Sequence, residues 1–452
     1  MKLFKPFINS IIIATLLCFT QVKQGMGAIN FTITDDGIEK SKILIYGFSN
    51  QDENLNGDIL EIKNRIIKNL NSTNLVQFID HEPSDANAQE QIIDIESIPN
   101  FLKFQNQNIA GLLIGKFSYN DQGDLELKIR MWDINDKKQD FGKHYLASRH
   151  NYRQLANSIS NEIFKAVSRE AVGHFSSRIV YVGETGPINQ RIKKINMIDF
   201  DGENYRNLTN DNELVLTPNF TKNQNLIYYL RYYENKPQIF SLDLRNKNTE
   251  KLGGFYATTF ASSPHPLDDN LVILSAIIDG NCDIYEMNIA ENFAKRLTKN
   301  PAIDTTASYS PDGKLIVFSS DRQAGQQLYV MNSNGSYTSR ISQGQGSYSK
   351  PSWSPDGKLI AFTKIKSGQF MVGTMTPNGR AEKILTTAYL VEGARWSPNG
   401  RYLIYSKKKG PYGRDSIPRL YSVDIITGHE YEIPTPKNEG AIDPDWSLIS
   451  AT

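Results

Sequence analysis

A stretch that recurs at a nearly constant interval is the feature that most constrains how this chain folds. The segment "PSWSPDGKLIAF" (residues 351–362) is a close copy of "ASYSPDGKLIVF", which ends 44 residues earlier at Phe318. Related apolar runs mark six units at intervals of 44 to 47 residues, and they begin at Ile179, Leu226, Leu271, Leu315, Leu359 and Leu403. A period in this range is typical of four-stranded blades rather than of helical solenoids. The repeat therefore predicts six blades.

Each well-preserved unit contains its own hairpin signal. In the unit at 351–362, "PSWS" predicts a short strand, "SPDG" a tight turn and "KLIAF" the returning strand. Proline fixes φ at the second turn position, aspartate bonds the turn backbone, and glycine accepts a positive φ. The second and third units read "PNFTKNQN" and "SSPHPLDDN" at the same place, so their turn chemistry is eroded.

The two ends of the repeat region complete each other. The first unit opens at Arg178 on a second strand, with no "PxWS" segment before it, whereas the chain ends in "DPDWS", residues 443–447, with no strand after it. Pairing of the end with the beginning would remove the free sheet edges of an open ring. The sequence thus predicts a six-bladed β-propeller closed by its C-terminal strand.

The segment before the repeats has a mixed pattern. "KILIY" predicts a short strand, "LELKIRMW" alternates with Leu125, Leu127, Ile129 and Met131 inward, and two helical stripes follow the spacing of an amphipathic helix. The stripes consist of Ile59, Ile62, Ile66 and Leu70, and of Leu155, Ile159, Ile163 and Val167. We expect loops at 49–57 and 81–92. The fold class is mainly β with an α/β N-terminal domain, divided into a signal peptide (1–27), a flexible arm (28–38), the α/β domain (39–172) and the propeller (173–452).

The N-terminus and the composition bear on location and partners. Lys2 and Lys5, a mainly apolar run from Ile11 to Phe19, and small residues near Gly27 predict a cleaved secretory signal peptide. The alternative is an N-terminal membrane anchor, although the run is shorter than the roughly 20 residues that a span needs. Lys and Arg total 50 against 49 for Asp and Glu, which argues against a nucleic-acid partner. We expect a monomer without direct membrane insertion.

No pattern in the sequence indicates catalysis. G-x-S-x-G, H-E-x-x-H, Walker and Rossmann motifs do not occur, and the six histidines are scattered. Asp312 and Asp356 of the SPDG turns could ring a channel as metal ligands, but turn capping explains them without a metal. The repeated tryptophans could stack on sugars, but their place in the hairpins favours packing between blades. We therefore expect no enzymatic activity, no cofactor and no metal.

Longer segments resemble a known family. "RLTKNPAIDTTASYSPDGKLIVFSSDRQAGQQLYVMNSNGSYTSRIS", "GHFSSRIVYVGE" and "MIDFDGENYRNLT" are similar to the TolB family, periplasmic propeller proteins of the Tol-Pal envelope system. The resemblance covers essentially the whole chain. A bare SPDG repeat is shared by many propellers, whereas the sequence around Ala302–Thr305, joined to this N-terminal domain, is far more specific.

The resemblance implies a non-catalytic periplasmic adaptor. Members bind the peptidoglycan-associated lipoprotein Pal through the propeller and the inner-membrane protein TolA through the mature N-terminus. They thereby support outer-membrane invagination during cell division and outer-membrane integrity. By the same resemblance, Thr305, Ala261 and Thr258 are the expected Pal-binding residues.

The expected TolA-binding arm is "INFTITDDG". Its alternating residues allow it to add as a strand to a sheet edge. The contact residues that we assign to it are Ile29, Phe31, Ile33, Asp35 and Asp36. The alternative is that this segment is the first strand of the α/β domain. For the whole protein, the competing functions are a periplasmic propeller that binds a small molecule or a glycan, and a propeller enzyme such as a metal-dependent lactonase.

Overall fold

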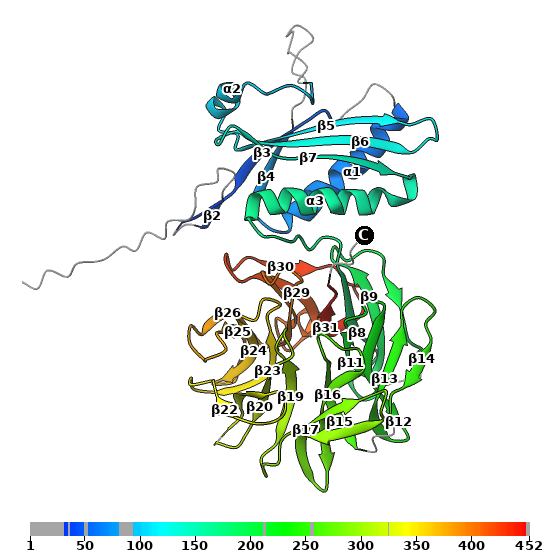
Figure 1. The fold of residues 1–452 in the computed structure, drawn as a ribbon, viewed down its shortest axis with the longest axis vertical. Helices are drawn as coiled ribbons and strands as arrows, with labels where there is room; N and C mark the ends of the chain where they lie inside the picture. The colour runs from blue at the N-terminus through cyan, green and yellow to red at the C-terminus, as the bar shows by residue number, and fades with distance from the viewer. Residues whose placement is uncertain are drawn as a thin grey trace, which may run out of the picture.

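The structure is a computed structural model that describes residues 31–34, 37–48, 53–80, 94–210, 214–253, 257–323 and 325–448. A small α/β domain lies against one side of a large ring of strands (Figure 1). Within the described ranges, no helix has both the length and the apolar character that crossing a membrane requires. The predicted signal peptide, residues 1–27, lies outside these ranges.

The α/β domain is built on one five-stranded sheet in the order β4-β3-β5-β6-β7. β3 runs parallel to β4 and β5, and the other neighbours are antiparallel. The inward alternation predicted for "LELKIRMW" is confirmed, because its four apolar residues are at most 1% exposed. The strands are β3 (Ser41–Tyr46), β4 (Val76–Asp80), β5 (Gly111–Tyr119), β6 (Leu125–Asp133) and β7 (Lys138–Ala147).

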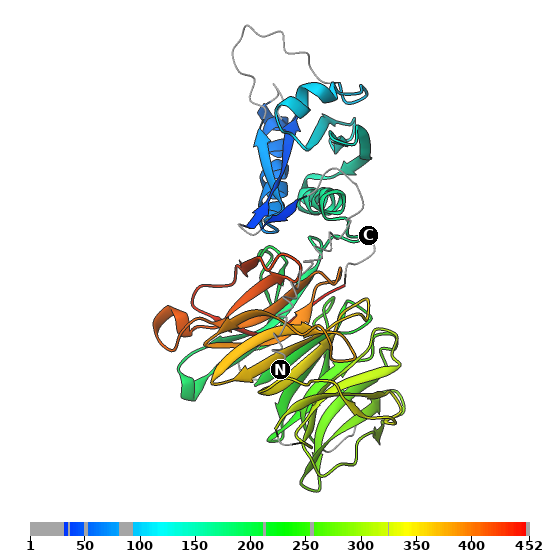
Figure 2. The same ribbon diagram turned by 90° about the vertical axis from the view of Figure 1, so that its left-hand side faces the viewer.

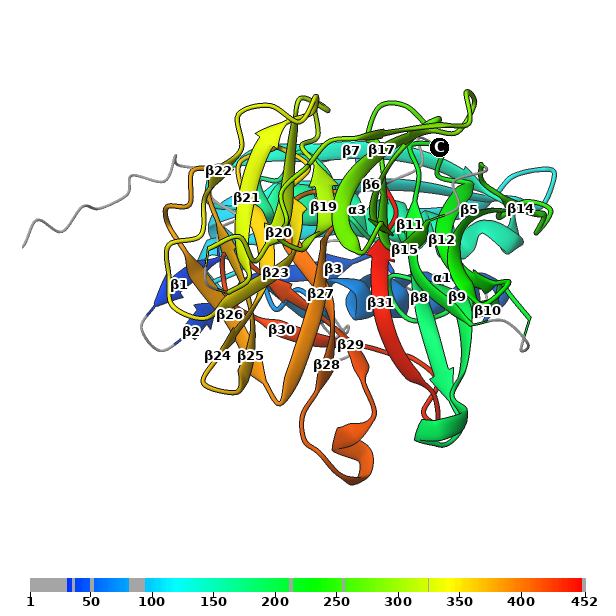
Figure 3. The same cartoon turned by 90° about the horizontal axis from the view of Figure 1, so that it is seen from below.

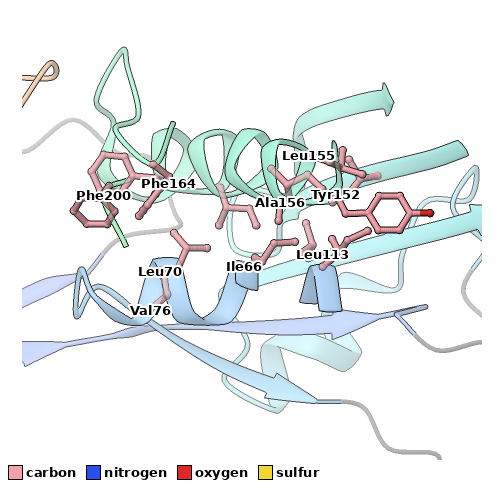
Figure 4. Close-up of a cluster of buried hydrophobic side chains, with 14 of the residues drawn as sticks. Ile66, Leu70, Val76, Leu113, Tyr152, Leu155, Ala156, Phe164 and Phe200 are labelled. Atoms are coloured by element: carbon pink, nitrogen blue, oxygen red, sulfur yellow. The ribbon is translucent and has the colours of Figure 1, made fainter. Parts of the chain in front are cut away.

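Two long helices cover one face of this sheet. α1 (Glu53–Asn71) and α3 (Tyr152–Ser168) bury the two predicted stripes in one core, which Figure 4 shows between them. The short helix α2 (Phe101–Asn106) contributes Phe104 to a separate core on the other face. The predicted loop at 49–57 is wrong from Glu53 onward, because the buried Leu55 extends the apolar face of α1 by one turn. The predicted loop at 81–92 lies outside the described residues.

The repeats form six four-stranded sheets, as predicted. The first three blades contain β8 (Arg178–Thr185), β9 (Ile192–Asp199), β10 (Arg206–Asn207); β11 (Val215–Phe220), β12 (Leu226–Tyr233), β13 (Lys236–Asp243), β14 (Thr249–Lys251); and β15 (Thr258–Pro264), β16 (Leu271–Ile278), β17 (Asn281–Asn288), β18 (Phe293–Arg296). The last three contain β19 (Asp304–Tyr309), β20 (Leu315–Ser320), β21 (Gln327–Asn332), β22 (Ser339–Arg340); β23 (Ser347–Trp353), β24 (Ile360–Lys366), β25 (Gln369–Met375), β26 (Lys383–Ala388); and β27 (Leu390–Trp396), β28 (Tyr402–Lys408), β29 (Arg419–Asp424), β30 (Glu430–Ile433).

The SPDG turns have the predicted chemistry. In blade four the Ser310 hydroxyl donates to Asp312 Oδ1 at 2.6 Å and accepts the Leu315 N–H at 2.9 Å, while Gly313 has φ +70°. The carboxylate of Asp312 also accepts the Lys314 N–H at 3.2 Å, and these bonds, that of Ser310 first, lower its pKa. Turn capping, as predicted, accounts for this aspartate.

The ring closes through the C-terminal strand. β31 (Gly440–Trp446) pairs antiparallel with β8, with Trp446 opposite Ile179, which confirms the predicted latch (Figure 3). The Trp446 indole donates to Ser177 Oγ at 2.5 Å. In the next blade along the ring, the Trp396 indole donates to the Ser352 carbonyl at 2.9 Å. Both rings are buried, so the predicted packing of tryptophans between blades is confirmed.

Aromatic residues fill the junction between the two domains. Seen from the side, α3 lies between the five-stranded sheet and the propeller (Figure 2). The linker residue His174 is fully buried, with its ring 4.7 Å from that of Phe200 and 4.6 Å from that of Tyr402. Burial, aided by the charge of Arg401, lowers the pKa of His174 to about 3. This histidine is structural and neutral at physiological pH.

An ion-pair network lies beside the aromatic junction. Arg65 and Lys68 of α1 and Arg153 of α3 face Asp201 and Glu203 in the turn after β9. The shortest distances are 2.6 Å from Arg153 to Asp201 and 2.7 Å from Lys68 to Glu203. Asp201 is only 6% exposed, so its charge depends on the two arginines of the α/β domain.

Candidate functional site

The two ends of each innermost propeller strand lie on different faces of the ring. The α/β domain contacts the turns that follow the innermost and third strands, as the Phe164–Tyr402 ring contact and the Arg153–Asp201 pair show. The N-terminal ends of the innermost strands lie on the opposite face, where Asp304 begins β19. We call this opening of the central channel, away from the α/β domain, the channel mouth.

Each innermost strand carries a one-residue bulge near the channel mouth. The register of the innermost strand shifts against the second strand in all six blades. A positive φ is rare for residues other than glycine and marks local backbone strain. Four bulges contain such a residue, namely Thr217 (46°), Thr306 (52°), Lys350 (48°) and Asp443 (46°), and a fifth has Gly393 (73°) at this place. Because these bulges recur at equivalent positions around the channel, they are a regular feature of its wall and not an isolated irregularity.

The bulges line a small cavity of about 70 Å³ that is partly open to solvent. Its wall consists mostly of small residues and prolines, among them Pro218, Ala261, Ala307, Pro351 and Ala394. Ser262 also lines it, and its buried hydroxyl has no hydrogen-bond partner among the residues that the structure describes.

Two ion pairs cross the channel. Lys350 Nζ lies 3.0 Å from Glu392 Oε2 and 3.7 Å from Asp443 Oδ1, so it joins three blades. Burial lowers the pKa of Lys350, but Asp443 and Glu392 outweigh that effect and the net shift is upward. Lysine is therefore charged at this position, and its charge is balanced within the channel.

The second pair lies next to the latch. Arg395 Nε is 3.7 Å from Asp445 Oδ1, and Asp445 Oδ2 accepts the Phe220 N–H at 2.8 Å. Burial raises the pKa of Asp445 to about 6, although Arg395 opposes the shift. Such a pKa would suit a general acid, but both oxygens are held by Arg395 and the Phe220 backbone, which indicates a structural role.

The three predicted Pal-binding residues come together at the channel mouth. Thr258 is the first residue of β15 and pairs with Ile277, whereas Thr305 pairs with Ser319 in the next blade. Ala261 lines the channel cavity, as does Thr306, the neighbour of Thr305. All three predicted residues are half-buried, so a partner would meet mainly their backbone and one side of each side chain.

The sequence did not predict several features of this face. Phe260 and Ile303 are large apolar residues, 49% and 54% exposed, that flank the predicted residues. Lys350 and its channel partners were not identified either. An apolar residue directly before an aspartate at the start of a repeat, as in Ile303-Asp304, is a signal that could have drawn attention to Ile303.

The described part of the predicted TolA-binding arm forms a separate hairpin. β1 (Thr32–Thr34) pairs with β2 (Gly37–Glu39), and neither belongs to the five-stranded sheet, so the arm is not the first strand of that sheet. Phe31 is half-buried at the domain junction, with the Arg401 guanidinium 5.2 Å from its ring centre. Ile33 pairs with Ile38. Ile29, Asp35 and Asp36 lie outside the described residues.

Within the described ranges, no three His, Cys, Asp or Glu side chains are grouped so that they could hold a metal ion. The geometry instead offers a partly open, largely apolar cavity whose lysine and arginine are paired with carboxylates. Such a surface suits recognition of another protein or of a small ligand.

Comparison with known proteins agrees with this architecture. The family described as the TolB amino-terminal domain matches residues 29–140, and the one described as the TolB beta propeller domain matches residues 168–450. A Tol-Pal system protein TolB from Gluconobacter oxydans (strain 621H) is 37% identical over 358 residues, which are 78% of this chain and 77% of that protein.

Solved structures support the fold. The crystal structure of TolB from Acinetobacter baumannii matches with a TM-score of 0.75 and 24% identity over 91% of this chain and 97% of that one. Hydrazine synthase from Kuenenia stuttgartiensis matches with a TM-score of 0.50 and 13% identity over 61% of this chain and 47% of that one, so the propeller fold alone does not identify a function. The two family matches and the curated relative together decide the assignment: this chain belongs to the TolB family of Tol-Pal system proteins.

Proposed function

We propose that this protein is a non-catalytic periplasmic adaptor of the Tol-Pal system. It binds Pal at the channel mouth and TolA through the N-terminal arm, and it supports outer-membrane invagination during division and outer-membrane integrity. The observation that carries the proposal is that Thr305, Ala261 and Thr258 lie together at a mouth that the α/β domain leaves uncovered.

The character of this face fits a protein partner better than a glycan. Glycan sites usually present an aromatic ring to the sugar, but Trp353, Trp396 and Trp446 are 5–8% exposed and pack between the blades. The exposed apolar residues of the mouth, Phe260 and Ile303, are of the kind that form the centre of protein interfaces. A partner that covers them would also exclude water from the channel.

Capture of soluble Pal from the same organism by the mature protein tests the first half of the proposal. We expect a one-to-one complex in calorimetry, and the protein without Pal should not bind short peptidoglycan-type glycans. Absence of binding to Pal, or binding of glycan in its place, would contradict the adaptor function.

The second half is tested by deleting residues 28–36 from the mature protein. The arm is an edge strand that can add to a partner sheet. Loss of these residues should abolish capture of the TolA C-terminal domain and leave both Pal capture and the melting of the propeller unchanged. Equal TolA affinity with and without the arm would place the TolA site elsewhere.

A further inference from the structure

The loop that leads into blade four, residues 297–303, has a fully buried carboxylate close to each end. Asp283 lies beside its start and Asp304 directly follows its end, and both are 0% exposed. Buried carboxylates are unfavourable unless each is paired and hydrogen-bonded. Their presence on both sides of one short loop therefore indicates that its conformation is tightly specified.

Arg322 neutralises Asp304. Its Nη2 atom lies 2.9 and 2.8 Å from the two carboxylate oxygens, and the guanidinium lies 4.8 Å from the centre of the Tyr329 ring. The neighbouring Asp321 accepts the Ile303 N–H at 2.8 Å. The turn after β20 thus holds both residues that precede Thr305. It binds Ile303 through its backbone N–H and Asp304 through its side chain.

The start of the loop is held in a similar way. Arg296 donates to Asp283 Oδ2 at 2.5 Å, and Thr298 donates to Asp283 Oδ1 at 3.1 Å. Asn281 links the same carboxylate to the Asn300 carbonyl, with both distances 2.8 Å. Few rotations remain for the residues between these two anchor points.

The side chain that this loop presents is Ile303, which is 54% exposed. In the adjacent blade, Phe260 (49%), Ile277 (36%) and Ile278 (37%) are exposed at the corresponding ends of β15 and β16. These four residues form an apolar rim on blades three and four, continuous with Thr258 and Thr305. Contiguous exposed apolar residues on a rigid support are typical of an interaction surface.

We propose that Ile303 is an apolar anchor for Pal and that Arg322 is a positioning residue, which fixes Ile303 and Thr305 through Asp304 before the partner arrives. This inference rests on the proposed function. A loop that is ordered in the free protein loses little conformational entropy on binding. Affinity therefore depends on the Arg322–Asp304 ion pair as well as on Ile303. The surface of Pal that covers Ile303 has to be largely apolar, since Ile303, Phe260, Ile277 and Ile278 are all apolar.

The test compares Pal affinity and amide exchange in four variants. Ile303→Ala should weaken Pal binding about tenfold without changing the melting temperature, because the residue is exposed. Its matched control is Ile426→Ala, an apolar residue of similar exposure (47%) on the face toward the α/β domain, which should bind Pal normally. Arg322→Gln should weaken binding at least about fivefold and speed exchange of the Ile303 and Thr306 amides in the free protein.

Loss of stability alone is controlled by Val317→Ala, a cavity in the core of the same blade. It should lower the melting temperature and leave Pal affinity and exchange of the Ile303 amide unchanged. If the wild type binds Pal and Ile303→Ala binds equally well, the anchor is refuted while the adaptor function stands. Faster exchange in Arg322→Gln at unchanged affinity would refute the positioning role. If the wild type does not bind Pal, the adaptor function fails, and the anchor fails with it.

Discussion

The face toward the α/β domain and the channel mouth are built from different kinds of residue. The first carries large aromatic rings, such as Phe200 and Trp446, stacked 5.7 Å apart in a core that both domains share. The second carries small residues on strained backbone and leaves Ile303 exposed. Burial of large rings supplies most of the stability of a fold, whereas strain and exposed apolar groups reduce it. The proposed partner site therefore lies on the face opposite to the one that supplies stability, so mutations should separate the two properties.

Removal of the latch should have the largest effect. Truncation after Lys437 deletes β31 and with it the buried Ala441 and Trp446, while the half-buried Ile442 contributes less. Burial of a large apolar side chain contributes about 1.5–3 kcal/mol, and β8 would also lose its only partner on one side. We expect the truncated propeller to unfold or aggregate, as measured by calorimetry and size-exclusion chromatography. A monomer that melts cooperatively at the wild-type temperature would contradict this role of the latch.

A histidine at the junction should make stability depend on pH. The pKa of His174 is about 3 in the folded protein and about 6.5 when unfolded, so the unfolded state binds the extra proton between these values. Stability from this residue is therefore present above pH 6.5 and is lost as the pH falls toward 3. Between pH 7 and pH 5 the loss should be about 2 kcal/mol in the free energy of unfolding from urea titrations.

His174→Phe should remove this part of the pH dependence, because phenylalanine does not titrate and fits among aromatic rings. The exposed His150, changed to Gln, serves as the control and should keep the wild-type slope. An unchanged slope in His174→Phe would mean that other groups cause the acid sensitivity.

The ion-pair network at the junction should contribute less. Arg153→Met keeps the aliphatic stem but leaves the buried Asp201 with Arg65 alone. Since Glu203 is 41% exposed and screened by solvent, we expect a loss of about 1–2 kcal/mol, smaller at high salt. Lys143→Met breaks an exposed pair with Glu162 at 3.9 Å and should change stability by less than about 0.5 kcal/mol. Equal effects of the two variants would show that burial of the network adds nothing.

The smallest effect on stability is expected at the channel mouth. Thr305→Arg places a charge at the proposed Pal interface, so Pal affinity should fall while the melting temperature changes little. Thr338→Arg makes the same change at an exposed position of the same blade on the other face and should bind Pal normally. If Thr305→Arg unfolds the protein, or binds Pal as well as Thr338→Arg does, the separation between the faces does not hold.

The fold could be predicted well from the sequence because the same strand–turn–strand pattern recurs in successive units. Each SPDG turn fixes a hairpin locally, and the unpaired ends at Arg178 and Trp446 left one way to close the ring. Local pattern gave a wrong prediction at Glu53, where a loop was expected because most of the residues are polar. A helix begins there, and its first turn is held by the buried Leu55.

The candidate site was less predictable because its features arise between blades. Resemblance supplied Thr305 and Ala261, but nothing local indicates that Lys350 meets Asp443 across the channel or that Asp304 is buried against Arg322. The contact between Lys350 and Asp443 depends on how the ring curves, and a period in the sequence does not encode that curvature. Likewise, an isoleucine would be expected to be buried, and only the structure shows that Ile303 is exposed.

The latch also has a consequence for the order of events during synthesis. The Trp446–Ser177 bond joins residues 269 positions apart, and β8 has no partner on its inner side until β31 exists. A ribosome that has made the chain up to β30 therefore holds five complete blades and a first sheet that still has an open edge. The ring can be completed only after β31 has emerged from the ribosome, and until then the open edge of β8 is the part that a holding chaperone would have to cover.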